Sequence, residues 1–169
     1  PSPRPLFAPF RLNAAGEVEL LAGLDLEGEE WTPIGNASVT TANAITGNAF
    51  TGVFNGGNHT VDNFKVTIPA TDGGSVAGLF GAVQGATIKD LTIGSKVVLK
   101  TSSKTFVTLG GVVGYAAEST LKNLDSYATL VNDGGADNVR LVIGGTGGTM
   151  YAPAAAPCPA EDPQRHARL

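Results

Sequence analysis

The chain is poor in the residues from which metal and cofactor sites are usually built. Its 169 residues include one cysteine, Cys158, and two histidines. A single cysteine excludes an intrachain disulfide and a cysteine-rich metal framework. One cysteine and two histidines are also too few for a zinc site, so we expect neither a metal nor a cofactor.

Charge is equally scarce, and its sign limits the partners. Charged residues make up 15% of the chain, against roughly a quarter in an average domain, and the net charge is −4. Without a basic surface, nucleic acid is not an expected partner. No apolar run reaches the roughly 18 residues that a membrane helix needs, so we expect no membrane insertion.

The residues that are abundant favour short strands and tight turns. Glycine accounts for 23 of the 169 positions, and 42% of the residues are hydrophobic, which leaves enough apolar surface to bury. Glycine, threonine, valine and isoleucine together are typical of strands joined by turns. The length fits about one domain.

A repeat dominates the middle of the chain. The stretch GLFGAVQGATIKDLTIGSKVVL (78–99) recurs without gaps as GVVGYAAESTLKNLDSYATLVN (111–132), a constant offset of 33. Val61, Phe64 and Val66 match Ile88, Leu91 and Ile93 at an offset of 27, and a partial copy follows at an offset of 34 over 143–148. A fixed period of this size indicates one structural unit laid down several times.

Within one unit, apolar residues have strand spacing rather than helical spacing. Leu91 and Ile93 alternate around Thr92, and Ile88 also points inward if the chain bends at Lys89–Asp90. One unit cannot bury such a face alone, but stacked units can, so the repeat predicts an all-β solenoid of about three to four coils. In this alignment Asn63, Asp90 and Asn123 form one column, and glycines such as Gly78, Gly81 and Gly110 mark corners.

The remaining segments flank this solenoid. We expect a leader at 1–9, an N-terminal cap and entry segment at 10–49, coils at 50–151 (units near 50–76, 77–108, 109–142 and a partial 143–151), and an Ala/Pro-rich linker or disordered tail at 152–169. The cap is expected to contain a short helix over Glu17–Leu24, and Phe10–Trp31 to cover the open first edge. Residues Asn36–Asn48 are expected to form a polar loop. The start PSPRPLF and the interrupted last unit suggest a piece of a larger protein.

Several motifs resemble those of GLUG-motif repeat proteins. They are WTPIG (31–35), FTGVFNGGNHTV (50–61) and the glycine corners AGLFG (77–81) and GGVVG (110–114). The resemblance implies a right-handed parallel β-helix from a bacterial surface or secreted protein, such as an adhesin or the non-catalytic region of a secreted peptidase. It transfers no catalytic residue, and it implies an extracellular or cell-surface location.

The leading functional hypothesis is a structural or adhesive module without catalytic activity. Solenoids bind through extended surfaces and loops on one face. The candidate loops are the inserts Thr67–Val76, Lys100–Thr108 and Asn132–Val142. The expected partner is a protein or glycan of a host or matrix surface.

A carbohydrate-active enzyme or a carbohydrate-binding module is the alternative. A glycosidase needs two carboxylates on either side of the scissile bond, and Asp90 and Asp125 are the one candidate pair. Lys89 and Lys122 beside them favour a solvated charged face instead. His59, which aligns with Ala86 and Ser119, is expected to be a turn residue. For Trp31, a buried plug at the entry to the core is favoured over a sugar-stacking platform.

Two further hypotheses rest on narrower patterns. A column of Thr60, Thr87 and Thr120 would suit an ice- or crystal-binding surface, although outward threonines are also simply good strand formers. An acidic cluster at Asp25, Glu27, Glu29 and Glu30 could form a weak calcium site, but no calcium-loop motif supports it and a solvated turn is favoured.

Overall fold

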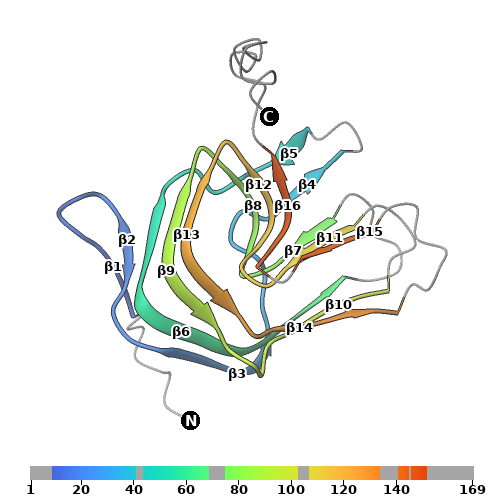
Figure 1. Cartoon of the computed structure of the whole chain (residues 1–169), viewed down its shortest axis with the longest axis horizontal. Coiled ribbons are helices and arrows are strands. Elements are labelled where there is room, and N and C mark those ends of the chain that lie inside the picture. Colours follow the sequence, from blue (N-terminus) through green and yellow to red (C-terminus); the bar gives the residue numbers. More distant parts are fainter. Residues whose placement is uncertain are drawn as a thin grey trace, which may run out of the picture.

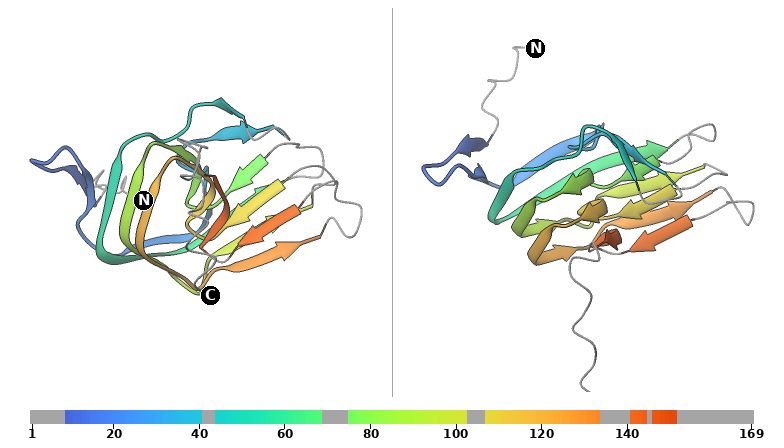
Figure 2. Two further views of the ribbon diagram at one scale, coloured as in Figure 1. Left: turned by 45° about the horizontal axis from the view of Figure 1, so that its top comes forward. Right: turned by 90° about the horizontal axis from the view of Figure 1, so that it is seen from above.

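The protein is a β-solenoid of about three turns, which confirms the all-β fold class (Figures 1 and 2). The computed structural model describes residues 9–40, 44–68, 75–102, 107–133, 141–144 and 146–151. No helix occurs among them, and accordingly none of them belongs to a helix able to cross a membrane. The expected leader, up to residue 8, and the expected tail at 152–169 lie outside the described residues.

Three sheets line the solenoid. The first contains β1 (Phe10–Leu12), β2 (Val18–Leu20), β3 (Leu24–Glu30), β6 (Val53–Ile68), β9 (Thr87–Ile93), β10 (Val98–Thr101), β13 (Thr120–Ser126) and β14 (Thr129–Asn132). The second contains β4 (Ala37–Val39), β5 (Ile45–Gly47), β7 (Ser75–Ala77), β11 (Val107–Gly110) and β15 (Leu141–Gly144). The third contains β8 (Phe80–Gln84), β12 (Val113–Ala117) and β16 (Gly147–Tyr151).

The repeated stretches stack in parallel, as the constant offset predicts. Phe80 lies opposite Val113 and Ile88 opposite Leu121, both 33 positions apart. Gly147 follows Val113 by 34 positions, which confirms the partial last copy. The ungapped alignment is wrong only beyond Ile93. Four residues separate Ile93 from Val98, but two separate Ser126 from Thr129, so β10 and β14 pair at an offset of 31.

The offset of 27 for the first coil is wrong. Strand β6 pairs with β9 through Phe54 opposite Ile88 and Val61 opposite Ile93, offsets of 34 and 32. A bulge explains the change, because Gly56, Gly57 and Asn58 lie opposite the single residue Asp90. The sequence VDNF (61–64) looks like IKDL (88–91). It lies instead further along β6, after the bulge, where it pairs with β3.

The bulge also changes the polar column at the first corner. Asp90 and Asn123 adopt left-handed backbone angles, with φ of 56° and 53°, as expected for a bend at Lys89–Asp90. Asn58, with φ of 62°, occupies the equivalent place in β6. Asn63 is therefore wrongly assigned to this column. Its backbone angle is also left-handed, but its side chain donates a hydrogen bond to Asp25 Oδ1 on β3, away from Asp90 and Asn123.

The N-terminal segment covers the outer edge of the first coil with strands. β2 and β3 both run parallel to β6, and β1 closes an antiparallel hairpin with β2. The expected helix over Glu17–Leu24 is wrong. Gly16 and Gly23 leave too few residues for a stable isolated helix, whereas Val18–Leu20 can pair on both sides.

The expected polar loop over Asn36–Asn48 is also partly wrong, because it contains the hairpin β4–β5. Ser38 on β4 pairs antiparallel with Ser75 on β7 and so covers the edge of the second sheet. Isolated bridges from Ile34 to Phe80 and from Phe50 to Val83 cover the third sheet. Residues before Val53 thus cover the first edge of all three sheets.

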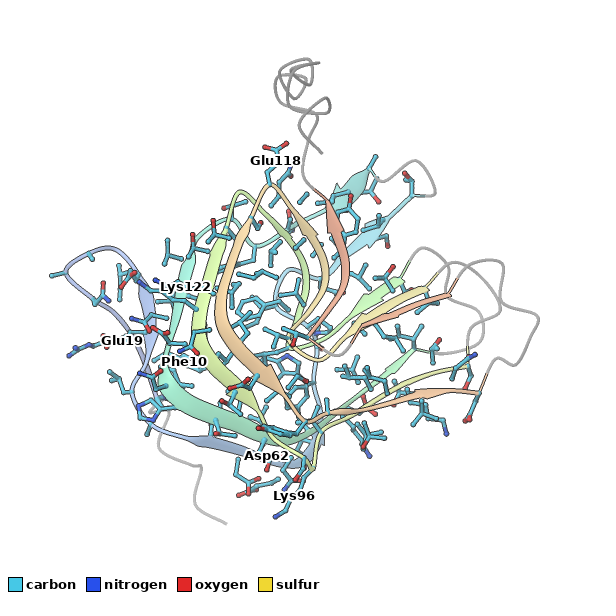
Figure 3. The ribbon with its side chains drawn as sticks, in the orientation of Figure 1. Phe10, Glu19, Asp62, Lys96, Glu118 and Lys122 are labelled. Atoms are coloured by element: carbon cyan, nitrogen blue, oxygen red, sulfur yellow. The ribbon has the colours of Figure 1, made fainter. Side chains whose placement is uncertain are left out.

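Inward side chains of successive coils fill the interior (Figure 3). Ile88, Leu91 and Ile93 are at most 1% exposed, as their spacing predicts. Phe54 contacts Phe80 at a ring-centroid distance of 5.2 Å. The glycine corners leave no room for side chains, since a Cβ on Gly78 would lie 2.5 Å from the Gly110 carbonyl oxygen.

Candidate ligand-binding site

The three inserts start and end on stacked positions. Thr101 at the end of β10 lies between Ile68 of β6 and Asn132 of β14. Val107 at the start of β11 lies between Ser75 of β7 and Leu141 of β15. The described ends of the inserts therefore lie on one side of the solenoid, where the ends of β10 and β14 lie beside β7, β11 and β15 (Figure 1). Residues 69–74, 103–106 and 134–140 within them lie outside the described residues.

A cavity of about 550 Å³ lies at the base of the first insert. The end of β3, the turn after it, β4 and the ends of β6 and β7 line this space, which is open to solvent on one side. Its lining residues are Glu30, Trp31, Thr32, Pro33, Asn36, Ala37, Ser38, Val66, Thr67, Ile68, Ser75 and Val76. We call this space the entry cavity.

Trp31 is held in place along one side of the entry cavity. Its indole Nε1 donates to the Leu79 carbonyl oxygen at 3.0 Å, and its ring centroid lies 6.2 Å from that of Phe64. Its backbone N–H donates to the Lys65 carbonyl oxygen at 2.8 Å. The residue packs against the core with one hydrogen-bond partner, as a plug would, but it is only half-buried and also lines the cavity.

The polar part of the lining consists of hydrogen-bonding groups with one negative charge. Glu30 Oε1 accepts a hydrogen bond of 2.7 Å from Thr67 Oγ1, which orients the carboxylate. Asn36 supplies an amide, and Thr32, Ser38, Thr67 and Ser75 supply hydroxyl groups. No lysine, arginine or histidine is among the lining residues that the structure describes. These groups suit a polar ligand without negative charge.

Sequence reasoning missed this cavity because its walls are remote in sequence. In the sequence, Glu30 belongs to the acidic cluster and Asn36 to the expected polar loop. The pairing of Ser38 with Ser75 and the hydrogen bond between Glu30 and Thr67 bring the entry segment beside the first insert. The one signal in the sequence was the single tryptophan, Trp31, directly after an acidic residue.

The acid pair lies elsewhere, on the strands β9 and β13. Asp125 pairs with Thr92, as the alignment predicts. Asp90 sits at the left-handed corner, where its Oδ1 accepts a hydrogen bond of 2.8 Å from Asn123 Nδ2. Lys89, next to Asp90 in β9, forms an ion pair with Glu17.

Two other candidates lie at positions that differ from the sequence alignment. His59 follows the bulge of β6 and pairs with Leu91, so its predicted alignment with Ala86 and Ser119 is wrong. Thr60 pairs with Thr92, whereas Thr87 pairs with Thr120. The threonine column of the ice-binding hypothesis therefore loses Thr60.

The acidic cluster lies along the exposed strand β3. Asp25 Oδ1 accepts hydrogen bonds from the backbone N–H of Glu27 at 2.7 Å and from Asn63 Nδ2 at 2.9 Å. Glu30 turns to Thr67 instead. Among the described residues, no group of three or more His, Cys, Asp or Glu side chains is arranged to hold a metal ion.

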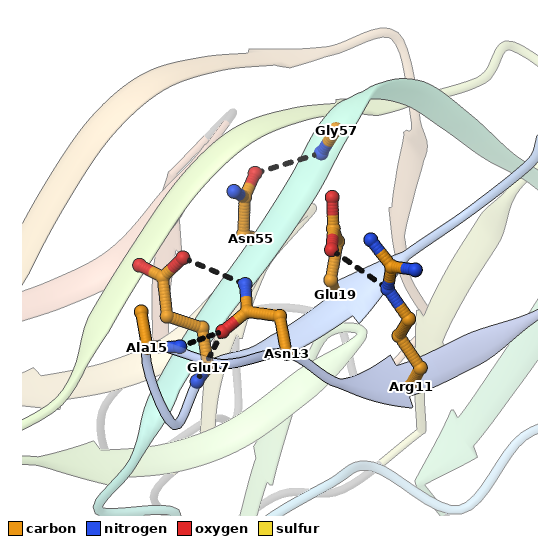
Figure 4. A network of polar contacts seen from close by, with 7 residues as sticks. All are labelled: Arg11, Asn13, Ala15, Glu17, Glu19, Asn55 and Gly57. Atoms are coloured by element: carbon orange, nitrogen blue, oxygen red, sulfur yellow. Dashed lines mark hydrogen bonds and ion pairs between the residues drawn. The ribbon is translucent and has the colours of Figure 1, made fainter.

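The β1–β2 hairpin holds a polar network that the sequence does not reveal, in which Asn13 bonds to Glu17 and Arg11 to Glu19 (Figure 4). An ion pair between Glu17 and Lys89 of β9 ties this hairpin to the coils. Glu17 Oε2 lies 2.6 Å from Lys89 Nζ, and Glu17 Oε1 accepts a hydrogen bond of 3.0 Å from Asn13 Nδ2. The hydrogen bond from Lys89, followed by that from Asn13, lowers the pKa of Glu17 below its ordinary value of 4.5. The same carboxylate raises the pKa of Lys89 above 10.5.

Comparison with protein-family models, with curated proteins and with solved structures gives no match. The resemblance to GLUG-motif repeat proteins therefore stays a prediction from the sequence motifs.

Proposed function

We propose that this chain is a non-catalytic adhesive and structural module of a bacterial cell-surface or secreted protein. It binds a protein or glycan of a host or matrix surface through the face that carries the inserts. We further propose that it continues into other domains or repeats of a larger protein. The observation that carries the proposal is the stacking of all three insert ends on one side, with the entry cavity at the base of the first.

The structure of the coils supports a scaffold role for them, with binding left to the inserts. The repeated coils bury apolar side chains. Polar corner residues such as Asp90 form hydrogen bonds with the neighbouring coil. Such a scaffold fixes the ends of its inserts relative to one another, and a scaffold that is already ordered lowers the entropy cost of binding. The sequence motifs that resemble surface proteins supply the proposed location.

The test compares the whole chain with a loop-replacement variant. In that variant, residues 69–74, 103–106 and 134–140 become Gly/Ser sequences of equal length. Both are applied to a panel of purified matrix proteins and arrayed glycans, with circular dichroism as the check on folding. The proposal predicts binding by the natural chain and its loss in the folded variant. Undiminished binding by that variant, or no binder in the panel for the natural chain, would contradict it.

A second arm addresses the carbohydrate-active alternative. The chain is incubated with a panel of polysaccharides, and the release of reducing ends or unsaturated products is measured. Our proposal predicts no release. Release that is abolished in both Asp90→Asn and Asp125→Asn would establish the enzyme instead.

A further inference from the structure

The entry cavity has the dimensions of a small-molecule site. Its volume of about 550 Å³ lies within the roughly 300–1,000 Å³ typical of ligand pockets. Its walls come from two pairs of strands: β3 pairs with β6 in the first sheet, and β4 pairs with β7 in the second. Pre-formed walls allow a ligand to bind without ordering them.

The lining combines apolar side chains with hydrogen-bonding groups. Trp31 supplies its aromatic surface, and its hydrogen bond to Leu79 and its contact with Phe64 prevent the indole from turning freely. The other apolar lining residues are Pro33, Ala37, Val66, Ile68 and Val76. The hydrogen-bonding groups are the Glu30 carboxylate, the Asn36 amide and the hydroxyl groups of Thr32, Ser38, Thr67 and Ser75. A ligand that matches this lining has an apolar face and many hydroxyl groups at its rim.

The charge of the lining excludes other ligand classes. Glu30 is the only charged side chain among the lining residues that the structure describes. Phosphate, sulfate and uronic acid groups would meet this carboxylate with no cation to offset it. A quaternary ammonium ligand favours several aromatic faces, whereas Trp31 is the only aromatic residue among the described residues of the lining.

We infer that the entry cavity is a binding site for a neutral saccharide. The C–H face of a sugar ring lies against the indole of Trp31. Glu30, oriented by Thr67, accepts hydrogen bonds from two ring hydroxyl groups, and Asn36 donates to a third oxygen. The inference deepens the proposed function, on which it rests, by naming the ligand class of the insert-bearing face.

The single tryptophan of the chain makes the test direct. The whole chain is titrated with cellobiose, lactose and di-N-acetylchitobiose while tryptophan fluorescence is recorded, and calorimetry repeats the measurement. At least one sugar is expected to give a saturable change at millimolar concentration or below. Choline chloride and glucuronate are expected to give none.

Variants separate the cavity from the rest of the surface. Glu30→Gln and Asn36→Ala are each expected to raise the Kd about tenfold, because each removes a hydrogen bond to the sugar. Trp31→Phe, followed by calorimetry, is expected to weaken binding further. Glu29→Gln and Tyr127→Ala are the controls and are expected to leave the Kd unchanged, since both residues are exposed and neither lines the cavity.

Three outcomes would overturn the inference. They are no saturable response to any sugar, binding of choline or glucuronate in preference to sugars, and sugar binding unaffected by the Glu30 and Asn36 substitutions. These failures differ from failure of the proposed function. If the loop-replacement variant loses binding to matrix proteins while no sugar binds the natural chain, the adhesive function stands and the saccharide site falls.

Discussion

Asn123 Nδ2 lies 2.8 Å from Asp90 Oδ1, across the parallel strands β13 and β9. The same nitrogen lies 3.3 Å from Asn58 Oδ1, so one amide joins the corners of three coils. All three residues have left-handed backbone angles, which asparagine and aspartate tolerate better than other residues with side chains. Asp90, the more enclosed member of the candidate acid pair, is thus part of a structural column.

Two substitutions at Asn123 separate its backbone role from its hydrogen bonds. Asn123→Ala removes the hydrogen bonds and leaves a strained left-handed residue, which costs roughly 1–2 kcal/mol. Asn123→Gly removes the same hydrogen bonds but adopts the angle without strain. Urea denaturation is expected to show a larger loss of unfolding free energy for Asn123→Ala than for Asn123→Gly. Equal losses would mean that the left-handed angle carries no cost.

Gly114 is expected to reject even a methyl group. A Cβ there would lie 2.8 Å from the Ala77 nitrogen and 2.9 Å from the Gly81 carbonyl oxygen, both backbone atoms held in the coil below. Gly114→Ala should lower the unfolding free energy by at least about 1–3 kcal/mol, the usual cost of overpacking. Gly23→Ala is the matched control, because its nearest contact is 3.6 Å away. Thermal unfolding measures both, and a Gly114→Ala protein as stable as Gly23→Ala would refute the close packing.

The ion pair between Glu17 and Lys89 makes docking of the β1–β2 hairpin depend on pH. The pKa of Glu17 is lowered, so its stabilising contribution is complete above 4.5 and is lost as pH falls through the lowered value. The pKa of Lys89 is raised, so its contribution is complete below 10.5 and is lost as pH rises through the raised value. The hairpin should be most firmly docked between these limits.

Hydrogen exchange of Leu20 and its neighbours, expressed as protection factors, measures this docking. The protection factors of the natural chain are expected to fall as the pH is lowered into the acid range. Those of Glu17→Gln should already be low and should not change further as the pH falls. Glu19→Gln is the control. Its partner Arg11 has a side chain that is 60% exposed, and exposed pairs contribute little. Identical acid profiles for the natural chain and Glu17→Gln would contradict the role of the pair.

Thr108 is expected to tolerate an apolar replacement. Its side chain is fully buried in β11, and within the described part of the chain its Oγ1 has no hydrogen-bond partner. Valine has nearly the same shape and removes the cost of burying an unpaired hydroxyl group, which is about 1–3 kcal/mol. Thr108→Val should therefore raise the midpoint of thermal unfolding. A lower midpoint would show that the hydroxyl group is paired in solution.

The sequence was sufficient to predict the solenoid because the repeat determines both the strand pattern within a coil and the stacking between coils. Leu121 falls on Ile88 and Leu124 on Leu91, so each local strand pattern agrees with the stacking above and below it. Inward positions such as Ile93 could be read from alternation alone, and the structure buries them. The polar corner at Asp90 followed from the same alignment.

Features that depend on tertiary partners could not be predicted. VDNF (61–64) resembles IKDL (88–91) in sequence, yet the bulge at Gly56–Asn58 moves it to another corner. Val18–Leu20 forms a strand because β6 and β1 lie on either side, which no local propensity records. The entry cavity required Ser38 to meet Ser75, a pairing between segments without sequence similarity.

The central claim is that the chain binds its partner through the insert-bearing face. The most direct test compares two sets of variants for binding to one immobilised ligand. The matrix protein or glycan that binds the natural chain best is immobilised, and binding of each variant is measured at equal folded concentration. Our account predicts that Glu30→Gln with Asn36→Ala weakens binding, and that Lys122→Gln with Asp125→Asn on β13 does not. The reverse result, with binding lost through β13 and kept without Glu30 and Asn36, would contradict it.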